Sequence, residues 1–436
     1  MDISDNKWSS YIVAVSGSVL FFSHYLLGGF GLSSGDAQRV CLVIFSTFAI
    51  FLGASNLRSV FFLPVGVAAS LLVDGTVGGV KQLSYLALLA GVVVFSSQVL
   101  LLRRHVLQVI FLLYLFSFVL FLVGWLAYGF NGMSLSFGDA FPWFGHVRYF
   151  NHFQTATLLF LPLGAVIGRV YSRLFSMVGG ALAFALLFVS QGRGAAVSLL
   201  IGFVVILLFV KDRQFLFRYS FNLVVMIGFG LLIYLIFNAG SAQFGVDLIG
   251  RDLAVDNRSA IWRAASISIM ERPWSGWGAY SYAFSDFQSW MPAHPHQAFL
   301  LIAFEWGVPV AIGILIVAVG AIFIMAKRVV EIGDISLSLA FAAFIALCVH
   351  AQVSSVLTMP VGQLMFALLL GQLLSATKLM SSLPVKNYYF SFFGFAIGVW
   401  VLVCSSYITY SGSSDDDWNR VHLNDRIQPR TWNNAS

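Results

Sequence analysis

The feature that most limits the fold of this chain is a series of long apolar stretches that follow one another along its 436 residues. An apolar run of about 20 residues can cross the ~30 Å hydrocarbon core of a bilayer as a helix. Hydrophobic residues make up 59% of the chain and charged residues only 10%, with a mean hydropathy of +0.88. Water-soluble domains of this length do not have such a balance. The sequence therefore predicts an all-α polytopic membrane protein.

The apolar stretches predict about 12–13 transmembrane helices. They lie near 11–29, 39–54, 59–78, 83–102, 106–129, 151–170, 175–191, 195–210, 220–239, 299–325, 336–356, 361–377 and 388–409. One large polar loop separates the ninth span from the tenth. The predicted organisation is an N-terminal transmembrane bundle at 1–240, a loop with the active site at 241–296, a C-terminal bundle at 297–409 and a polar tail at 410–436.

The distribution of lysine and arginine predicts the orientation of these spans. With the N-terminus inside, the inside segments hold most of the basic residues, as the positive-inside rule expects. The short outside loops hold only Arg39, Lys81, Arg148 and Arg193. The large loop is then extracytoplasmic. The net charge of +6 reflects this anchoring in membrane lipid, and we expect no nucleic-acid partner.

Two short outside segments carry candidate site residues. Arg193 lies in a very tight connection between spans, with the sequence SQGRGA at 190–195. Its flanking glycines would let the backbone bend close to a ligand, and an arginine at membrane depth indicates an anion site. The alternative is an arginine that anchors a helix end. Arg148, a supporting candidate, has the same alternative within an aromatic belt.

The large loop supplies two more arginine candidates. Arg258 begins a stretch whose apolar spacing favours a helix beside the membrane face, and its planar guanidinium can bind a diphosphate through two hydrogen bonds. Arg263 in the same stretch is a supporting candidate. For Arg251, Arg263 and Arg272 the alternative is a solvated face.

The loop ends in His294-Pro295-His296-Gln297, where we expect the catalytic base. Pro295 favours a helix start, and the positive end of a helix dipole favours a neutral imidazole that can accept a proton from a substrate. His296 is the predicted base, with His294 and Gln297 as supporting residues. The alternative is a pair of interfacial histidines without chemistry. His350, inside a later span, is expected to satisfy a local hydrogen bond.

The sequence contains no usual motif for a metal or a cofactor. The acidic residues of the loop are scattered, the three cysteines lie far apart in apolar stretches, and no P-loop, HExxH, DxD or GxSxG motif occurs in a credible structural context. We therefore expect neither a metal nor a cofactor. Arginines would replace the cation in chemistry on a phosphorylated donor.

Three sequence blocks resemble the O-antigen ligase and polymerase superfamily of bacterial envelope glycosyltransferases. They are SQGRGA at 190–195, RSAIWR at 258–263 with ERP at 271–273 and GWG at 276–278, and HPHQ at 294–297. The superfamily includes lipid A-core O-antigen ligases, Wzy-type polymerases and protein O-oligosaccharyltransferases. Its ligase motif, a histidine and a polar residue, nine residues and a glycine, fits His296, Gln297 and Gly307. Val310 stands where the motif has a second glycine.

The resemblance implies a role for each candidate. Arg193 and Arg258 would bind the diphosphate of an undecaprenyl-diphosphate-linked glycan, and His296 would deprotonate or orient the acceptor hydroxyl. The glycan would be transferred with inversion and without a metal. The resemblance also implies a multi-pass protein of the bacterial inner membrane whose active site faces the periplasm.

The sequence leaves the acceptor open between lipid A-core and a protein such as a pilin. The segments RYFN at 148–151 and QT at 154–155 are similar to those of pilin-glycosylating members, which favours a protein. The alternative within the superfamily is a polymerase, whose acceptor is another lipid-linked repeat unit. From another class, a lipid-linked sugar transporter would show repeated halves and charges near the bilayer midplane.

Overall fold

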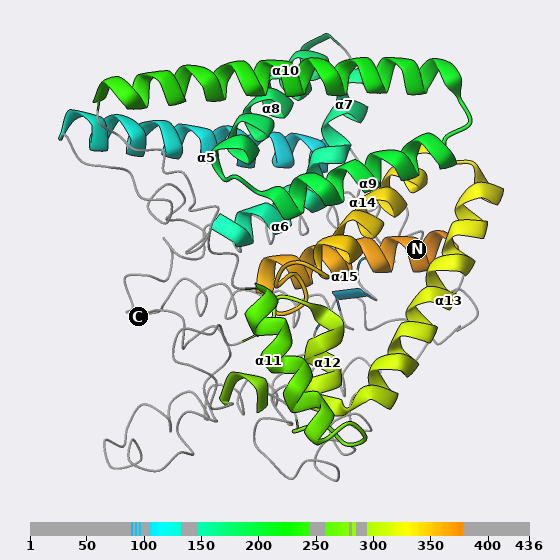
Figure 1. Cartoon of the computed structure of the whole chain (residues 1–436). Helices are drawn as coiled ribbons and strands as arrows, with labels where there is room; N and C mark the ends of the chain where they lie inside the picture. Colours follow the sequence, from blue (N-terminus) through cyan, green and yellow to red (C-terminus); the bar gives the residue numbers. More distant parts are fainter. Residues whose placement is uncertain are drawn as a thin grey trace, which may run out of the picture. The chain divides into compact units, whose positions relative to one another are not determined.

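The computed structural model describes residues 104–131, 147–168, 170–244, 258–278, 281–284 and 294–377, with Leu89, Val92, Val93 and Ser96. The secondary-structure elements of these residues are helices (Figure 1). Five helical segments are long and apolar enough to cross a membrane: Val106–Phe130, Val147–Ile167, Ser172–Val189, Arg213–Gly240 and Val308–Ile332. The predicted all-α polytopic membrane fold is therefore confirmed. The predicted spans at 11–29, 39–54, 59–78 and 388–409, most of 83–102 and the tail at 410–436 lie outside the described residues.

The chain divides into two compact units. The first holds the described residues of Val99–Val255 and Ala326–His350. The second holds those of Gly35–Gln98, Asp256–Met325 and Ala351–Ser436. Arg148 and Arg193 belong to the first unit, whereas Arg258, Arg263 and the histidines at 294 and 296 belong to the second.

The first unit is a bundle of apolar helices. They are α5 (Arg104–Phe130), α6 (Val147–Thr157), η6 (Leu158–Phe160), α7 (Leu161–Ile167), α8 (Val170–Val189), α9 (Arg193–Phe209), α10 (Arg213–Phe244) and α14 (Ile335–His350). Helix α10 packs against α8, and α14 packs against α9 and α6 (Figure 1). Gly202 permits the close approach of α9 to α14, because a Cβ there would lie 2.7 Å from Leu159 Cδ1 and 3.1 Å from the Ala342 carbonyl oxygen.

Helix α6 is polar in sequence and yet buried. Its side chains find partners on neighbouring helices, as buried polar groups require. Gln154 Nε2 donates to the Ala183 carbonyl over 3.0 Å, and Thr155 Oγ1 lies 2.8 Å from His350 Nδ1. The expected local hydrogen bond of His350 is thereby confirmed. Within the 148–155 segment, Arg148 and Tyr149 are half-buried and 150–155 are buried in the bundle.

The second unit contains the loop helix and the helices that follow it. They are α11 (Arg258–Glu271), η7 (Ser281–Phe284), α12 (Ala298–Trp306), most of α13 (Val308–Ile332), and α15 (Pro360–Ala376). Helix α11 packs against α12 through a core of Ala265, Ile269, Tyr282 and Phe304. The helix predicted to begin at Arg258 is thus present, and its apolar face is covered by α12.

Three predicted spans differ from the helices. The span 299–325 is divided into α12 and α13 at Gly307, whose φ of +87° a continuous helix does not allow. The span 220–239 belongs to a longer helix that begins at Arg213, because the Asp212 carboxylate caps it by accepting from the N–H groups of Gln214 and Phe215. The span 336–356 ends as a helix at His350, and turns occupy 351–359.

Candidate active site

The segment His294-Pro295-His296, called the histidine turn below, precedes α12 and is buried. Only 3% of His294 and 7% of His296 is exposed to solvent. The two imidazole rings meet edge to face with centroids 4.4 Å apart. The two side chains come together because the turn lies outside α12, which begins at Ala298. His296 has a φ of +53°, a conformation that few residues other than glycine adopt.

The structure fixes the histidine turn to α12 and to the segment after α14. Gln297 is the N-cap of α12, and its side chain accepts a hydrogen bond from the Leu300 N–H. Ala298 N–H donates to the Ala351 carbonyl over 3.2 Å. Gln297 therefore supports His296 through the backbone, as a cap that sets where the helix begins. The turn itself is expected to be rigid.

Helix α11 also contacts the histidine turn. Trp262 Nε1 donates to the Pro295 carbonyl over 2.9 Å. Arg258 lies half-buried in the first described turn of the same helix, whereas Arg263 is exposed on its surface. The exposure of Arg263 agrees with the solvated-face alternative for that residue. Arg258 and Trp262 are four residues apart and so share one face of α11.

A second contact fixes the far end of α12. The turn at 273–278 makes three backbone hydrogen bonds with the break between α12 and α13: Trp277 N to Phe304 O at 2.8 Å, Gly278 N to Glu305 O at 2.9 Å, and Val308 N to Pro273 O at 2.7 Å. Gly276 (φ +67°) and Gly307 (φ +87°) lie at this contact, where any Cβ would run into the facing backbone. The turn at 273–278, with its proline and glycines, therefore holds the C-terminal end of α12 in place.

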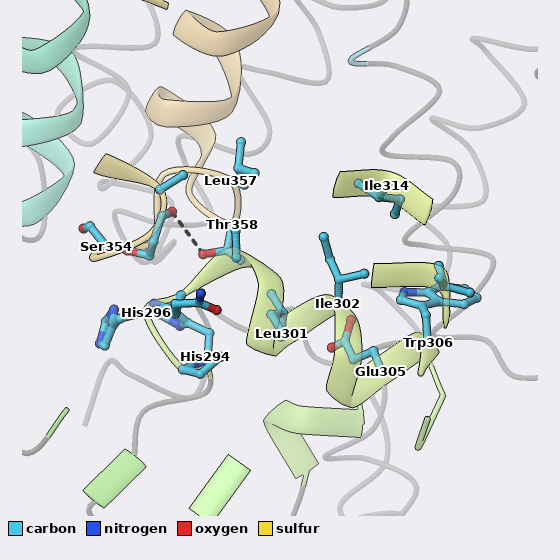
Figure 2. A pocket seen from close by; sticks show the side chains of 16 residues that line it. His294, His296, Leu301, Ile302, Glu305, Trp306, Ile314, Ser354, Leu357 and Thr358 are labelled. Carbon is cyan, nitrogen blue, oxygen red and sulfur yellow. Dashed lines mark hydrogen bonds between the residues drawn. The ribbon is translucent and has the colours of Figure 1, made fainter. Parts of the chain in front are cut away.

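A pocket of about 370 Å³ opens beside the histidine turn. Its polar lining consists of His294, His296, Gln297, Glu305, Ser354, Ser355 and Thr358, and its apolar lining includes Leu301, Ile302, Trp306, Val310, Ile314 and Leu357. Figure 2 shows the two imidazoles side by side at one end of α12, with Ile302, Glu305 and Trp306 farther along the helix. The site thus joins two histidines to a largely apolar cavity.

Glu305 is a pocket residue that the sequence analysis missed. It is only 1% exposed and is the one acidic residue between 297 and 330. An ionisable residue inside an apolar span indicates a functional site by default, so the sequence did contain a signal. Ser354 and Thr358, also missed, lie in the turns at 351–359, of which the sequence analysis had assigned 351–356 to a span.

In the first unit, Arg193 projects from a turn that is itself buried. The segment 190–193, called the arginine turn below, joins α8 to α9, and Gly192 is the N-cap of α9. Ser190 Oγ donates to Asn151 Oδ1 over 2.8 Å, and a Cβ on Gly192 would lie 2.8 Å from Asn151 Nδ2. Arg193 is exposed. Gln191, not a glycine, takes the positive φ of the turn, at +46°.

Arg148 lies on α6, one turn before Asn151, and is half-buried. Beyond Asn151 the same helix carries His152, whose ring lies edge to face with that of His350 at a centroid distance of 5.2 Å. Arg148 and Asn151, which supports the arginine turn, therefore belong to the same buried polar helix. Among the residues that the structure describes, no group of three His, Cys, Asp or Glu side chains could hold a metal ion. Metal independence stays a prediction.

Comparison with known proteins shows which protein family the chain resembles. No curated protein matches the chain. Residues 178–315 match the family described as O-antigen ligase, and this stretch contains the arginine turn, α11 and the histidine turn. Members of this family are bacterial membrane proteins with glycosyltransferase-like activity. The matched stretch carries all three resembling sequence blocks and supports the predicted likeness to the O-antigen ligase and polymerase superfamily.

Proposed function

We propose that this protein transfers a preassembled glycan from undecaprenyl diphosphate to an acceptor hydroxyl, as an O-antigen ligase or O-oligosaccharyltransferase. The observation that carries the proposal is the buried pair of imidazoles at one end of a 370 Å³ pocket, on a stretch that matches O-antigen ligase. A histidine near neutrality can take a proton, and burial excludes the water that would compete with the acceptor.

In the proposed reaction His296 accepts the proton of the acceptor hydroxyl as its oxygen attacks the anomeric carbon. The new bond joins this oxygen to the anomeric carbon, and the bond from that carbon to the diphosphate oxygen breaks. Undecaprenyl diphosphate leaves with the electron pair, so the configuration at the anomeric carbon inverts. The proton on His296 then passes to solvent. His294, whose ring contacts that of His296, keeps the base in place.

Arg193 and Arg258 are proposed to bind the donor diphosphate. Each lies in the first described turn of its helix, α9 or α11. Free backbone N–H groups and the positive end of the helix dipole favour phosphate at a helix start such as that of α9, and at both positions the guanidinium can add paired hydrogen bonds. Charge on the leaving diphosphate would be stabilised without a metal ion.

We place the enzyme in the bacterial inner membrane with the pocket on the periplasmic side. The Lys and Arg distribution supports this orientation. For the acceptor, the segment at 148–155 favours a protein such as a pilin over lipid A-core. A Wzy-type polymerase remains the alternative within the family, and it would extend one lipid-linked repeat unit with another.

The test is a transfer assay with purified protein and undecaprenyl-diphosphate glycan in separate tubes with a pilin, with lipid A-core and without added acceptor, each with and without EDTA. Transfer to pilin that survives EDTA and is lost in His296→Ala supports the proposal, and transfer to lipid A-core makes the enzyme an O-antigen ligase. A ladder of longer glycan lipids without acceptor would identify a polymerase. Absence of transfer in every tube would refute the proposed function.

A further inference from the structure

Trp262 connects the loop helix to the base, and neither the resemblance nor the family match gives it a role. Its indole N–H donates to the carbonyl of Pro295, the residue between the two histidines, over 2.9 Å. Pro295 is buried, and a buried carbonyl needs a donor. The indole of α11 supplies that donor.

The backbone of the histidine turn requires contacts that keep it in its conformation. His296 adopts a φ of +53°, a strained conformation that persists only when the surroundings determine it. On the α12 side, the Gln297 cap and the hydrogen bond from Ala298 to Ala351 hold the chain. On the preceding side, the Trp262 indole holds the Pro295 carbonyl. The turn is thus held from both sides of His296.

We propose that Trp262 is a positioning residue, which holds the Pro295 carbonyl and thereby aims the His296 imidazole into the pocket. The inference rests on the proposed role of His296 as the base. Because Trp262 shares a face of α11 with Arg258, the same helix that would bind donor diphosphate also aligns the base. A shift of about 1 Å in a catalytic group can lower the rate by roughly 10²-fold, so one hydrogen bond at this place matters.

The competing interpretation is that Trp262 only packs against its neighbours. Trp277 provides a matched control. Its indole N–H donates to the Ser268 carbonyl over 2.8 Å, and its ring is half-buried in the same unit. The two tryptophans therefore make the same kind of bond, from an indole N–H to a backbone carbonyl, but of these two bonds only the one from Trp262 reaches the histidine turn. Replacement of either by Phe keeps an aromatic ring and removes the N–H.

The experiment compares Trp262→Phe with Trp277→Phe in the purified full-length protein. We expect Trp262→Phe to lower kcat for glycan transfer by about 10- to 100-fold and to change the donor KM by less than about 2-fold, since uniform binding is retained. Trp277→Phe should keep kcat within about 3-fold of wild type. Equal losses of kcat in the two variants, or full kcat in Trp262→Phe, would overturn the proposal.

Amide hydrogen exchange provides a second measurement that does not depend on activity. The amides of 296–300 should exchange faster in Trp262→Phe than in wild type and should be unchanged in Trp277→Phe. Unchanged exchange at 296–300 in Trp262→Phe contradicts the positioning role. If the wild type transfers no glycan to any acceptor, the proposed function has failed, and the exchange data still decide whether Trp262 holds the turn.

Discussion

The arginine turn and the histidine turn both precede a helix, but they are built in opposite ways. The arginine turn contacts the buried polar helix α6 and exposes Arg193 on the protein surface. The histidine turn carries its two imidazole side chains inward, with 3% and 7% exposure, beside a pocket. In the arginine turn the supporting residues are buried and the Arg193 cation is exposed. In the histidine turn the imidazoles are buried and are held through the backbone.

This difference fits two different tasks. An exposed guanidinium on a fixed support can bind a charged headgroup that arrives from the membrane surface, because it pays little desolvation before binding. A base that takes a proton in the transition state gains from a site without water. We therefore expect substitutions in the arginine turn to change donor binding, and substitutions in the histidine turn to change the chemical step.

The largest effect is expected for His296→Ala. General base catalysis contributes roughly 10²- to 10⁴-fold, so kcat for glycan transfer should fall by about 10³-fold while the Kd for the donor stays close to that of wild type. Single-turnover transfer and equilibrium binding of a fluorescent donor analogue measure the two quantities. His294→Ala is the matched control, because it removes the neighbouring ring at 4.4 Å. A larger loss of kcat in His294→Ala would mean that His294 is the base.

The next effect is expected for Arg193→Ala and Arg258→Ala. A charge-assisted hydrogen bond contributes about 1.5–3 kcal/mol, which corresponds to a rise of roughly 10- to 100-fold in donor KM. Arg→Lys at either position should restore little, because lysine lacks the planar fork. Arg263→Ala, on the exposed face of α11, is the control and should leave KM unchanged. Full activity of Arg193→Lys would show that Arg193 only anchors a helix end.

A smaller effect is expected at two glycines: Gly192 of the arginine turn and Gly307, which ends the helix that follows the histidine turn. Gly307→Ala places a Cβ against the Trp274 backbone at a φ of +87°, and neither can adjust, so we expect a loss of about 2–4 kcal/mol in stability. Gly192→Ala has a favourable φ of −72° and meets only the Asn151 side chain, so about 1 kcal/mol is expected. Thermal unfolding in nanodiscs compares the two. An equal decrease in Tm would show that the 273–278 contact is not rigid.

The sequence predicted the helices that are defined only by the length of an apolar stretch. The span 106–129 appears as Val106–Phe130, because nothing but hydrophobicity is needed to define it. The break at Gly307 was missed, since its conformation depends on hydrogen bonds from the distant turn at 273–278. The burial of α6 was missed for the same reason, because the partners of its polar side chains lie on α8 and α14.

The candidate site was predictable in part. Residue chemistry and spacing led to Arg193, Arg258 and His296, but the contact between His294 and His296 requires a turn geometry that the pattern does not contain. The Asn151 support of the arginine turn is likewise a contact between segments 39 residues apart. Glu305 differs from these, because an acidic residue alone in an apolar stretch is visible in the sequence.

The smallest effect on the transfer kinetics is expected for Ser190→Ala, which tests the support of the arginine turn. The variant removes the 2.8 Å hydrogen bond to Asn151 Oδ1 and leaves a buried acceptor, at a cost of about 1–3 kcal/mol in stability. Because Arg193 itself is retained, donor KM should rise by only a few-fold, with kcat unchanged. Ser198→Ala, which removes a bond from α9 to its own Gly194 carbonyl, is the control and should change neither value. A loss of kcat in Ser190→Ala would show that the arginine turn takes part in the chemical step, and the division of tasks between the two turns would then be wrong.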